Sequence, residues 1–174
     1  MNKKKKKRAT KKAIVKYIIF TAVFLLLFGE YSVIEYSKFF SSLQIRDYPE
    51  VNAVASSIKN DCLNETLSWG DENCDFCEFY RVEDYINNNV TYKPPWHFIP
   101  KNPVDTIKDG GDCKDKATLA IDLLKSLGHN NIYLVFQLDY SIQAGHQCWA
   151  VQYHGRIMFF DCNDMPIVGI RKIL

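Results

Sequence analysis

Acidic residues are absent from the first 29 positions of this 174-residue chain, and basic residues are scarce in the rest. Residues 1–16 hold nine of the 22 Lys and Arg, which leaves 13 basic against 20 acidic residues, a net charge of −7 for the remainder against +2 for the whole chain. Affinity for nucleic acid needs a clustered basic face. The main body lacks that face, so we expect no nucleic-acid partner.

The sequence also lacks a full-length apolar run, because a membrane-spanning helix normally uses roughly 20 apolar residues. The apolar stretch covers only residues 17–29, but Lys16 before it can extend its ammonium group to the headgroups and lengthen the usable span. We therefore predict a transmembrane signal anchor. The cations before the span place the N-terminus in the cytoplasm and the following domain outside the cell membrane.

Two alternatives for this segment are a cleaved signal peptide and a peripheral or buried helix. No small-x-small cleavage site follows the apolar run, which favours the uncleaved anchor. The predicted organisation is a basic cytoplasmic tail at 1–12, the anchor at 13–29, a juxtamembrane helix or linker at 30–46, and one domain at 47–174.

A second closely spaced Cys/His pair, as a tetrahedral zinc site needs, is missing as well. Cys62, Cys74 and Cys77 supply three thiols, but for a domain in an oxidising compartment we favour a disulfide from Cys62 to Cys74 or Cys77. Nearby acidic residues lack the spacing of a calcium loop. We expect no metal and no cofactor.

Other cysteines and histidines have plainer interpretations. Cys148 and Cys162 are expected to be small buried apolar residues. Three histidines are expected to be solvated or in turns: His97, His129 and His154.

Apolar spacing predicts two helices before the centre of the chain. Val51, Val54, Ala55 and Ile58 predict a helix over about 49–60. Phe79, Val82 and Ile86 predict a second, ending in Asn87-Asn88-Asn89. The prolines at 94 and 95 predict a loop that runs to Gly111.

A third helix is predicted to begin at Cys113, with Asp112 as its cap and Asp115 in its first turn. Its apolar stripe ends before Gly128, which is expected to terminate it. The unpaired N–H groups of a helix N-terminus favour an anion, and a thiolate is a better nucleophile than a thiol. Cys113 is therefore a candidate nucleophile, although a cysteine simply packed beside a helix cap is the alternative.

Three strands are predicted after this helix, at 132–138, 146–153 and 156–161, the last two joined by a tight turn. His146 and Asp161 lie near the outer ends of the two joined strands. We expect these two residues to be cross-strand neighbours.

The segment Gly111-Asp112-Cys113-Lys114-Asp115-Lys116-Ala117, followed by His146 and by Asp161 after an aromatic strand, resembles the transglutaminase-like superfamily over about residues 79–167. The resemblance implies a papain-like α+β fold, with the helix that carries the nucleophile packed on a small antiparallel sheet. It also implies Cys113 as nucleophile, His146 as general base and acid, and Asp161 as the residue that orients the imidazole. Oxyanion donors would be the N–H of Cys113 and a group from the preceding loop, for which Trp96 is a candidate.

One position departs from the family pattern. Members commonly carry an aromatic residue two positions after the histidine, where this chain has Cys148, and Trp149 is displaced by one. The packing beside His146 is therefore expected to differ from that of the family.

The function we expect is that of a membrane-anchored cysteine hydrolase or acyl transferase that acts on peptide or isopeptide amides, with protein or peptide substrates and membrane lipid as partners. Hydrolysis and crosslinking both stay open. A second class is a non-catalytic binding or scaffold module of the same fold. A third is a redox or zinc switch built on the thiols at 62, 74 and 77.

Overall fold

The computed structural model describes residues 47–69, 75–94, 99–139 and 144–173. The predicted tail, anchor and juxtamembrane segment, residues 1–46, lie outside the described residues. Within the ranges that are described, no helix has the length and apolar character needed to cross a membrane.

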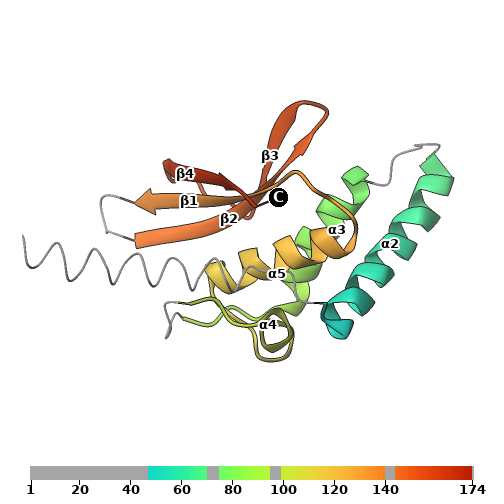
Figure 1. Cartoon of the computed structure of the whole chain (residues 1–174), viewed down its shortest axis with the longest axis horizontal. Helices are drawn as coiled ribbons and strands as arrows, with labels where there is room; N and C mark the ends of the chain where they lie inside the picture. Colours follow the sequence, from blue (N-terminus) through green and yellow to red (C-terminus); the bar gives the residue numbers. More distant parts are fainter. Residues whose placement is uncertain (1–46, 70–74, 95–98, 140–143, 174) are drawn as a thin grey trace, which may run out of the picture. The chain divides into compact units, whose positions relative to one another are not determined.

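The described domain is α+β, as expected, with helices on one side of an antiparallel sheet (Figure 1). The sheet has the spatial order β3-β2-β1-β4. In chain order the elements are α2 (Pro49–Trp69), α3 (Asp75–Asn89), α4 (Pro103–Asp109), α5 (Cys113–Ser126), β1 (Ile132–Asp139), β2 (Ala144–Tyr153), β3 (Arg156–Phe160) and β4 (Ile167–Lys172).

Helix α5 is the centre of the domain because it contacts β1 and β2 on one side and the other three labelled helices on the other (Figure 1). Every residue from 117 to 124 is buried, so this part of the helix is buried on all of its faces and not only along the predicted apolar stripe. On β1 and β2 the buried pairs Ile132 with Val151 and Leu134 with Trp149 belong to the same core. Burying a large apolar side chain contributes roughly 1.5–3 kcal/mol, so this layer holds α5 firmly.

The predicted end of α5 is confirmed. Gly128 has φ 101° and its N–H donates to the carbonyl of Lys125, while the N–H of His129 donates to the carbonyl of Leu124. These two bonds form a Schellman motif, in which a residue in the left-handed region follows the last helical turn.

Two elements were not predicted from the sequence. Helix α4 lies inside the segment expected to be a loop, where the Asn102 side chain accepts a hydrogen bond from the N–H of Val104 and Pro103 occupies the first turn. Strand β4, the second unpredicted element, pairs with β1 at the edge of the sheet. In addition, the helix predicted over 49–60 is longer than expected and continues to Trp69. The Asn-Pro pair was a helix-start signal inside an expected loop.

Two disulfides connect elements of the domain. Cys62 of α2 bonds to Cys77 of α3, which confirms one of the two predicted pairings and leaves neither thiol for zinc. Cys148 of β2 bonds to Cys162, so the expectation that these two are simply small buried apolar residues is wrong. Cys113 is the free cysteine among those described.

Candidate active site

Cys113 occupies the first position of α5, directly after the N-cap residue Asp112 and within a capping box formed by Asp112 and Asp115. The Asp112 carboxylate accepts hydrogen bonds from the N–H groups of Lys114 at 3.0 Å and Asp115 at 3.3 Å, and the Asp115 carboxylate accepts the N–H of Asp112 at 3.0 Å. Each residue thus satisfies a backbone donor that the helix start leaves unpaired. The cap predicted for this helix is confirmed.

The glycine pair before the cap is required by two close approaches. A Cβ on Gly111 would lie 2.4 Å from the Cβ of Asp115, and one on Gly110, at φ 76°, would lie 2.3 Å from the carbonyl oxygen of Thr91. Asp115 also accepts the N–H of Lys101 at 2.8 Å. The glycines and Asp115 therefore have a structural role in building this turn that is independent of catalysis.

His146 of β2 lies beside Cys113. Hydrogen bonding with the Cys113 side chain is the main cause that raises the pKa of His146 above its usual value, and burial acts in the opposite direction. The backbone bond to Asp161 and the negative charges of Cys113 and Asp161 raise the pKa further. This environment therefore favours the protonated form of the imidazole.

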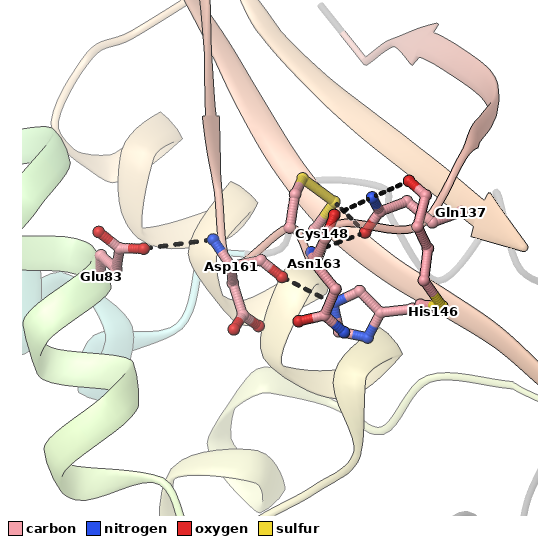
Figure 2. The surroundings of a disulfide bond; sticks show 8 residues. Glu83, Gln137, His146, Cys148, Asp161 and Asn163 are labelled. Atoms are coloured by element: carbon pink, nitrogen blue, oxygen red, sulfur yellow. Dashed lines mark hydrogen bonds between the residues drawn. A yellow bond between two sulfur atoms is a disulfide. The ribbon is translucent and has the colours of Figure 1, made fainter. Parts of the chain in front are cut away.

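The imidazole is held on its other side by the main chain of Asp161. Its Nε2 atom lies 2.6 Å from the Asp161 carbonyl oxygen (Figure 2). A carbonyl only accepts hydrogen bonds, so Nε2 carries a hydrogen and Nδ1 is left for the thiol of Cys113. The structure thus brings together the three residues expected from the sequence.

The contact with Asp161 differs from the one that the resemblance implies, because the main-chain oxygen makes the bond and not the carboxylate. Asp161 follows the last paired residue of β3 and has φ 54°, which turns its carbonyl toward His146. Burial raises the pKa of the Asp161 carboxyl, and the charges of His146 and Lys116 oppose that shift. The carboxylate therefore acts on the imidazole through its charge.

The unusual position after the histidine has a structural explanation. Cys148 forms a disulfide with Cys162, the residue that follows Asp161 (Figure 2). The disulfide therefore links β2, the strand that carries His146, to the residue next to the one whose carbonyl holds the imidazole. Trp149 on the opposite face is 1% exposed and stacks on Phe160 with ring centroids 4.3 Å apart.

Sequence reasoning did not identify two side chains that hold this region. The Gln137 amide accepts the N–H of Asn163 at 3.0 Å and donates to the carbonyls of Asn163 at 2.7 Å and Met165 at 2.8 Å. Glu83 of α3 accepts the N–H of Asp161 at 3.2 Å (Figure 2). Neither residue belongs to a motif, and the loop they hold is far from Glu83 in the sequence.

Tyr92 is a further neighbour of the thiol. Burial first, and then the negative charges of Cys113 and Asp112, raise the pKa of its hydroxyl. Tyr92 pairs with Gly111 in an isolated parallel bridge, which places it next to the turn before α5. Its phenol therefore stays protonated beside Cys113 and is available as a hydrogen-bond donor.

The remaining candidates have mixed outcomes. Trp96 and His97 lie outside the described residues. His154 is exposed in the tight turn at φ 47°, as predicted. The expectation of a solvated or turn residue is wrong for His129, whose side chain is 14% exposed and whose Nε2 lies 2.7 Å from Glu78.

His129 and Glu78 also form, with Asp75, a group whose ligand atoms lie within 4.8 Å of one another. The donor types suit a divalent cation. The contact between His129 and Glu78 is explained equally well by their own hydrogen bond, which joins the residue after the end of α5 to α3.

No family model and no curated protein matches this sequence. Among solved structures, a candidate cysteine protease from Cytophaga hutchinsonii is 18% identical with a TM-score of 0.52, over 77% of this chain and 47% of that one. LapG of Legionella pneumophila is 17% identical with a TM-score of 0.45, over 71% of this chain and 76% of that one. A candidate protease from Parabacteroides distasonis is 10% identical with a TM-score of 0.44, over 67% and 27%.

The similarity to the Cytophaga hutchinsonii structure shows a shared fold, and this chain spans about half the length of that protein. Function must be argued from the site, because one fold serves several activities.

Proposed function

We propose that this protein is a cysteine hydrolase or acyl transferase that acts on peptide or isopeptide amides through an acyl-enzyme on Cys113. The observation that supports the proposal most directly is the position of Cys113, at the N-terminus of α5, beside a His146 whose imidazole is held by the Asp161 carbonyl. A nucleophile within hydrogen-bond reach of a base, with a third group orienting the base, is the arrangement that covalent catalysis needs.

In the proposed reaction, His146 Nδ1 takes the thiol proton and the Cys113 thiolate attacks the amide carbonyl carbon. The N–H of Cys113, at the helix start, stabilises the resulting oxyanion. The imidazolium then gives its proton to the departing amine, and the C–N bond breaks to leave a thioester. Water resolves the thioester in hydrolysis, and an amine resolves it in acyl transfer.

We further propose that the domain is anchored to the membrane by residues 13–29 and works outside the cytoplasm. The basic residues at the N-terminus support this orientation. The two disulfides, Cys62 with Cys77 and Cys148 with Cys162, are typical of proteins in an oxidising compartment.

The test of the catalytic pair uses iodoacetamide labelling of the full chain, with the modified cysteine identified by peptide mass spectrometry. We expect Cys113 to react at pH 6, where ordinary thiols are mostly protonated, and to react at least about tenfold more slowly in His146→Ala. His154→Ala is the matched control, since this histidine is exposed in a turn.

Equal, slow labelling of Cys113 in the wild type and in His146→Ala would contradict the catalytic proposal and favour a binding or scaffold module. Turnover is measured as the amine that is released when the protein is incubated with a mixture of peptides. Cys113→Ser is expected to abolish that release, because a serine hydroxyl is far harder to ionise than a thiol.

A further inference from the structure

Phe160, the last residue of β3, is held by aromatic rings from two other elements. Trp149 of β2 stacks on it with a centroid distance of 4.3 Å, and two rings of α3 approach it edge-on, Tyr80 at 5.6 Å and Phe79 at 6.3 Å. Edge-to-face and stacked contacts of this kind restrict both partners. Helix α3 is thereby fixed against the end of β3, one residue before Asp161.

The next residue is bonded through both of its backbone groups. The N–H of Asp161 donates to Glu83 Oε1 at 3.2 Å, and its carbonyl accepts from His146 Nε2 at 2.6 Å (Figure 2). Its φ of 54° is in the left-handed region, which a residue with a Cβ keeps only where the surroundings hold it there. Glu83 supplies one of the contacts that hold it.

We propose that Glu83 is a positioning residue for the base of this site, acting through the backbone of Asp161. By accepting the Asp161 N–H, Glu83 fixes the peptide unit before Asp161 and so helps to hold the backbone conformation of this residue, whose carbonyl, in the next peptide unit, holds the imidazole of His146. The role deepens the proposed function and rests on it, because the orientation matters for catalysis only if His146 serves Cys113.

The consequence is a specific tautomer and ring orientation. While the Asp161 carbonyl faces Nε2, that nitrogen carries a hydrogen and Nδ1 is directed to the thiol. Without an acceptor from α3, the backbone at Asp161 relaxes from its left-handed conformation and the carbonyl turns from the ring. The base then samples orientations in which Nδ1 does not face Cys113.

The experiment compares three variants of the full chain. Glu83→Ala removes the acceptor, whereas Glu83→Gln keeps an amide oxygen at the same position. Asp84→Ala is the matched control, because it removes an acidic side chain from the adjacent, exposed position of the same helix. The readouts are the NMR titration of the His146 ring nitrogens and the pH profile of Cys113 alkylation, with melting temperature to establish that each variant is folded.

We expect Glu83→Ala to lower the alkylation rate of Cys113 at pH 6 about tenfold, the order of effect of one hydrogen bond to a charged group. The same variant should lower the midpoint of the His146 titration and lose the distinct Nε2–H signal. Glu83→Gln and Asp84→Ala should keep the wild-type profile.

The proposal is overturned if folded Glu83→Ala keeps the wild-type titration of His146, or if Glu83→Gln behaves like Glu83→Ala, because then the accepted hydrogen bond is not what matters. These outcomes are distinct from failure of the proposed function. That failure would appear as alkylation of Cys113 that is insensitive to His146→Ala, while the effect of Glu83 on the His146 titration is measured without reference to turnover.

Discussion

The Nε2 atom of His146 lies 2.6 Å from the main-chain oxygen of Asp161. Orientation of the ring and the effect of a negative charge on it, two roles usually assigned to one aspartate carboxylate, are therefore divided between two groups of Asp161. The backbone carbonyl orients the ring, and the carboxylate acts on it through charge. Because a main-chain atom makes the bond, substitution of the side chain does not remove it.

Asp161→Asn tests this separation. Asparagine tolerates the left-handed conformation well, so the backbone and its bond to His146 should be retained while the negative charge is lost. We expect the pKa of His146 to fall and amide turnover to drop less than about tenfold, whereas losing an orienting carboxylate costs up to about 10⁴-fold in a Ser-His-Asp triad. A loss near that larger figure, in steady-state turnover of the folded variant, would show that the carboxylate orients the ring.

The two disulfides provide a matched comparison, since they close loops with nearly equal sequence separations of 14 and 15 residues. Each double alanine variant, Cys148→Ala with Cys162→Ala or Cys62→Ala with Cys77→Ala, should lose about 3 kcal/mol of unfolding free energy in denaturant titrations. Only the first pair adjoins the base and its acceptor. It alone is expected to slow the alkylation of Cys113, and equal slowing in both variants would argue against a local role.

Gly111→Ala should disrupt the start of α5. Its new Cβ would lie 2.6 Å from Asp115 Oδ2, so the capping box must move, and overpacking of this kind costs roughly 1–3 kcal/mol. Gly169→Ala is the control, because the nearest atom to its Cβ would be a ring carbon of Phe136 at 3.7 Å, an ordinary contact. Thermal melts of the two variants test this prediction, because only Gly111→Ala should have a lowered melting temperature. Similar melting temperatures for the two variants would contradict the prediction.

Asp122 predicts a pH dependence of stability. Burial raises the pKa of its carboxyl to about 7, and the ammonium of Lys125, 3.9 Å away, only partly opposes that shift. Between the unfolded pKa of 3.8 and about 7 the folded state binds one proton more than the unfolded state, so stability falls as the pH rises through this window.

The contribution to the slope is about 1 kcal/mol per pH unit. Asp122→Asn cannot ionise and should lose this part of the slope, which denaturant titrations between pH 4.5 and 6.5 would reveal. An unchanged slope would mean that Asp122 is not the group responsible.

Local signals in the sequence were sufficient for the helix that carries Cys113. The cap at Asp112, the reciprocal bond from Asp115 and the terminating Gly128 act over a few neighbouring residues, so each is legible without tertiary context. The hairpin of β2 and β3 is similar, because His154 and Gly155 form its two-residue turn with φ 47° and 77°.

Helix α4 and strand β4 were missed for physical reasons. Helix α4 has seven residues, too few to show an apolar period, and its asparagine cap lies in a segment rich in proline. Strand β4 is mostly exposed at the edge of the sheet, so it has no apolar alternation. Its pairing with β1 is a contact between distant parts of the chain, and such pairings leave little local trace.

The sequence by itself determined which residues could react, because a thiol at a helix start, a histidine and an aspartate are identified by residue type and local spacing. Only the tertiary structure decided how they are connected. Packing of α3 against the end of β3 brings Glu83 to Asp161 across 78 positions, and the left-handed backbone there turns a carbonyl to His146 where a carboxylate was expected. Such contacts depend on the burial of Phe160 between two elements, and no local pattern encodes that arrangement.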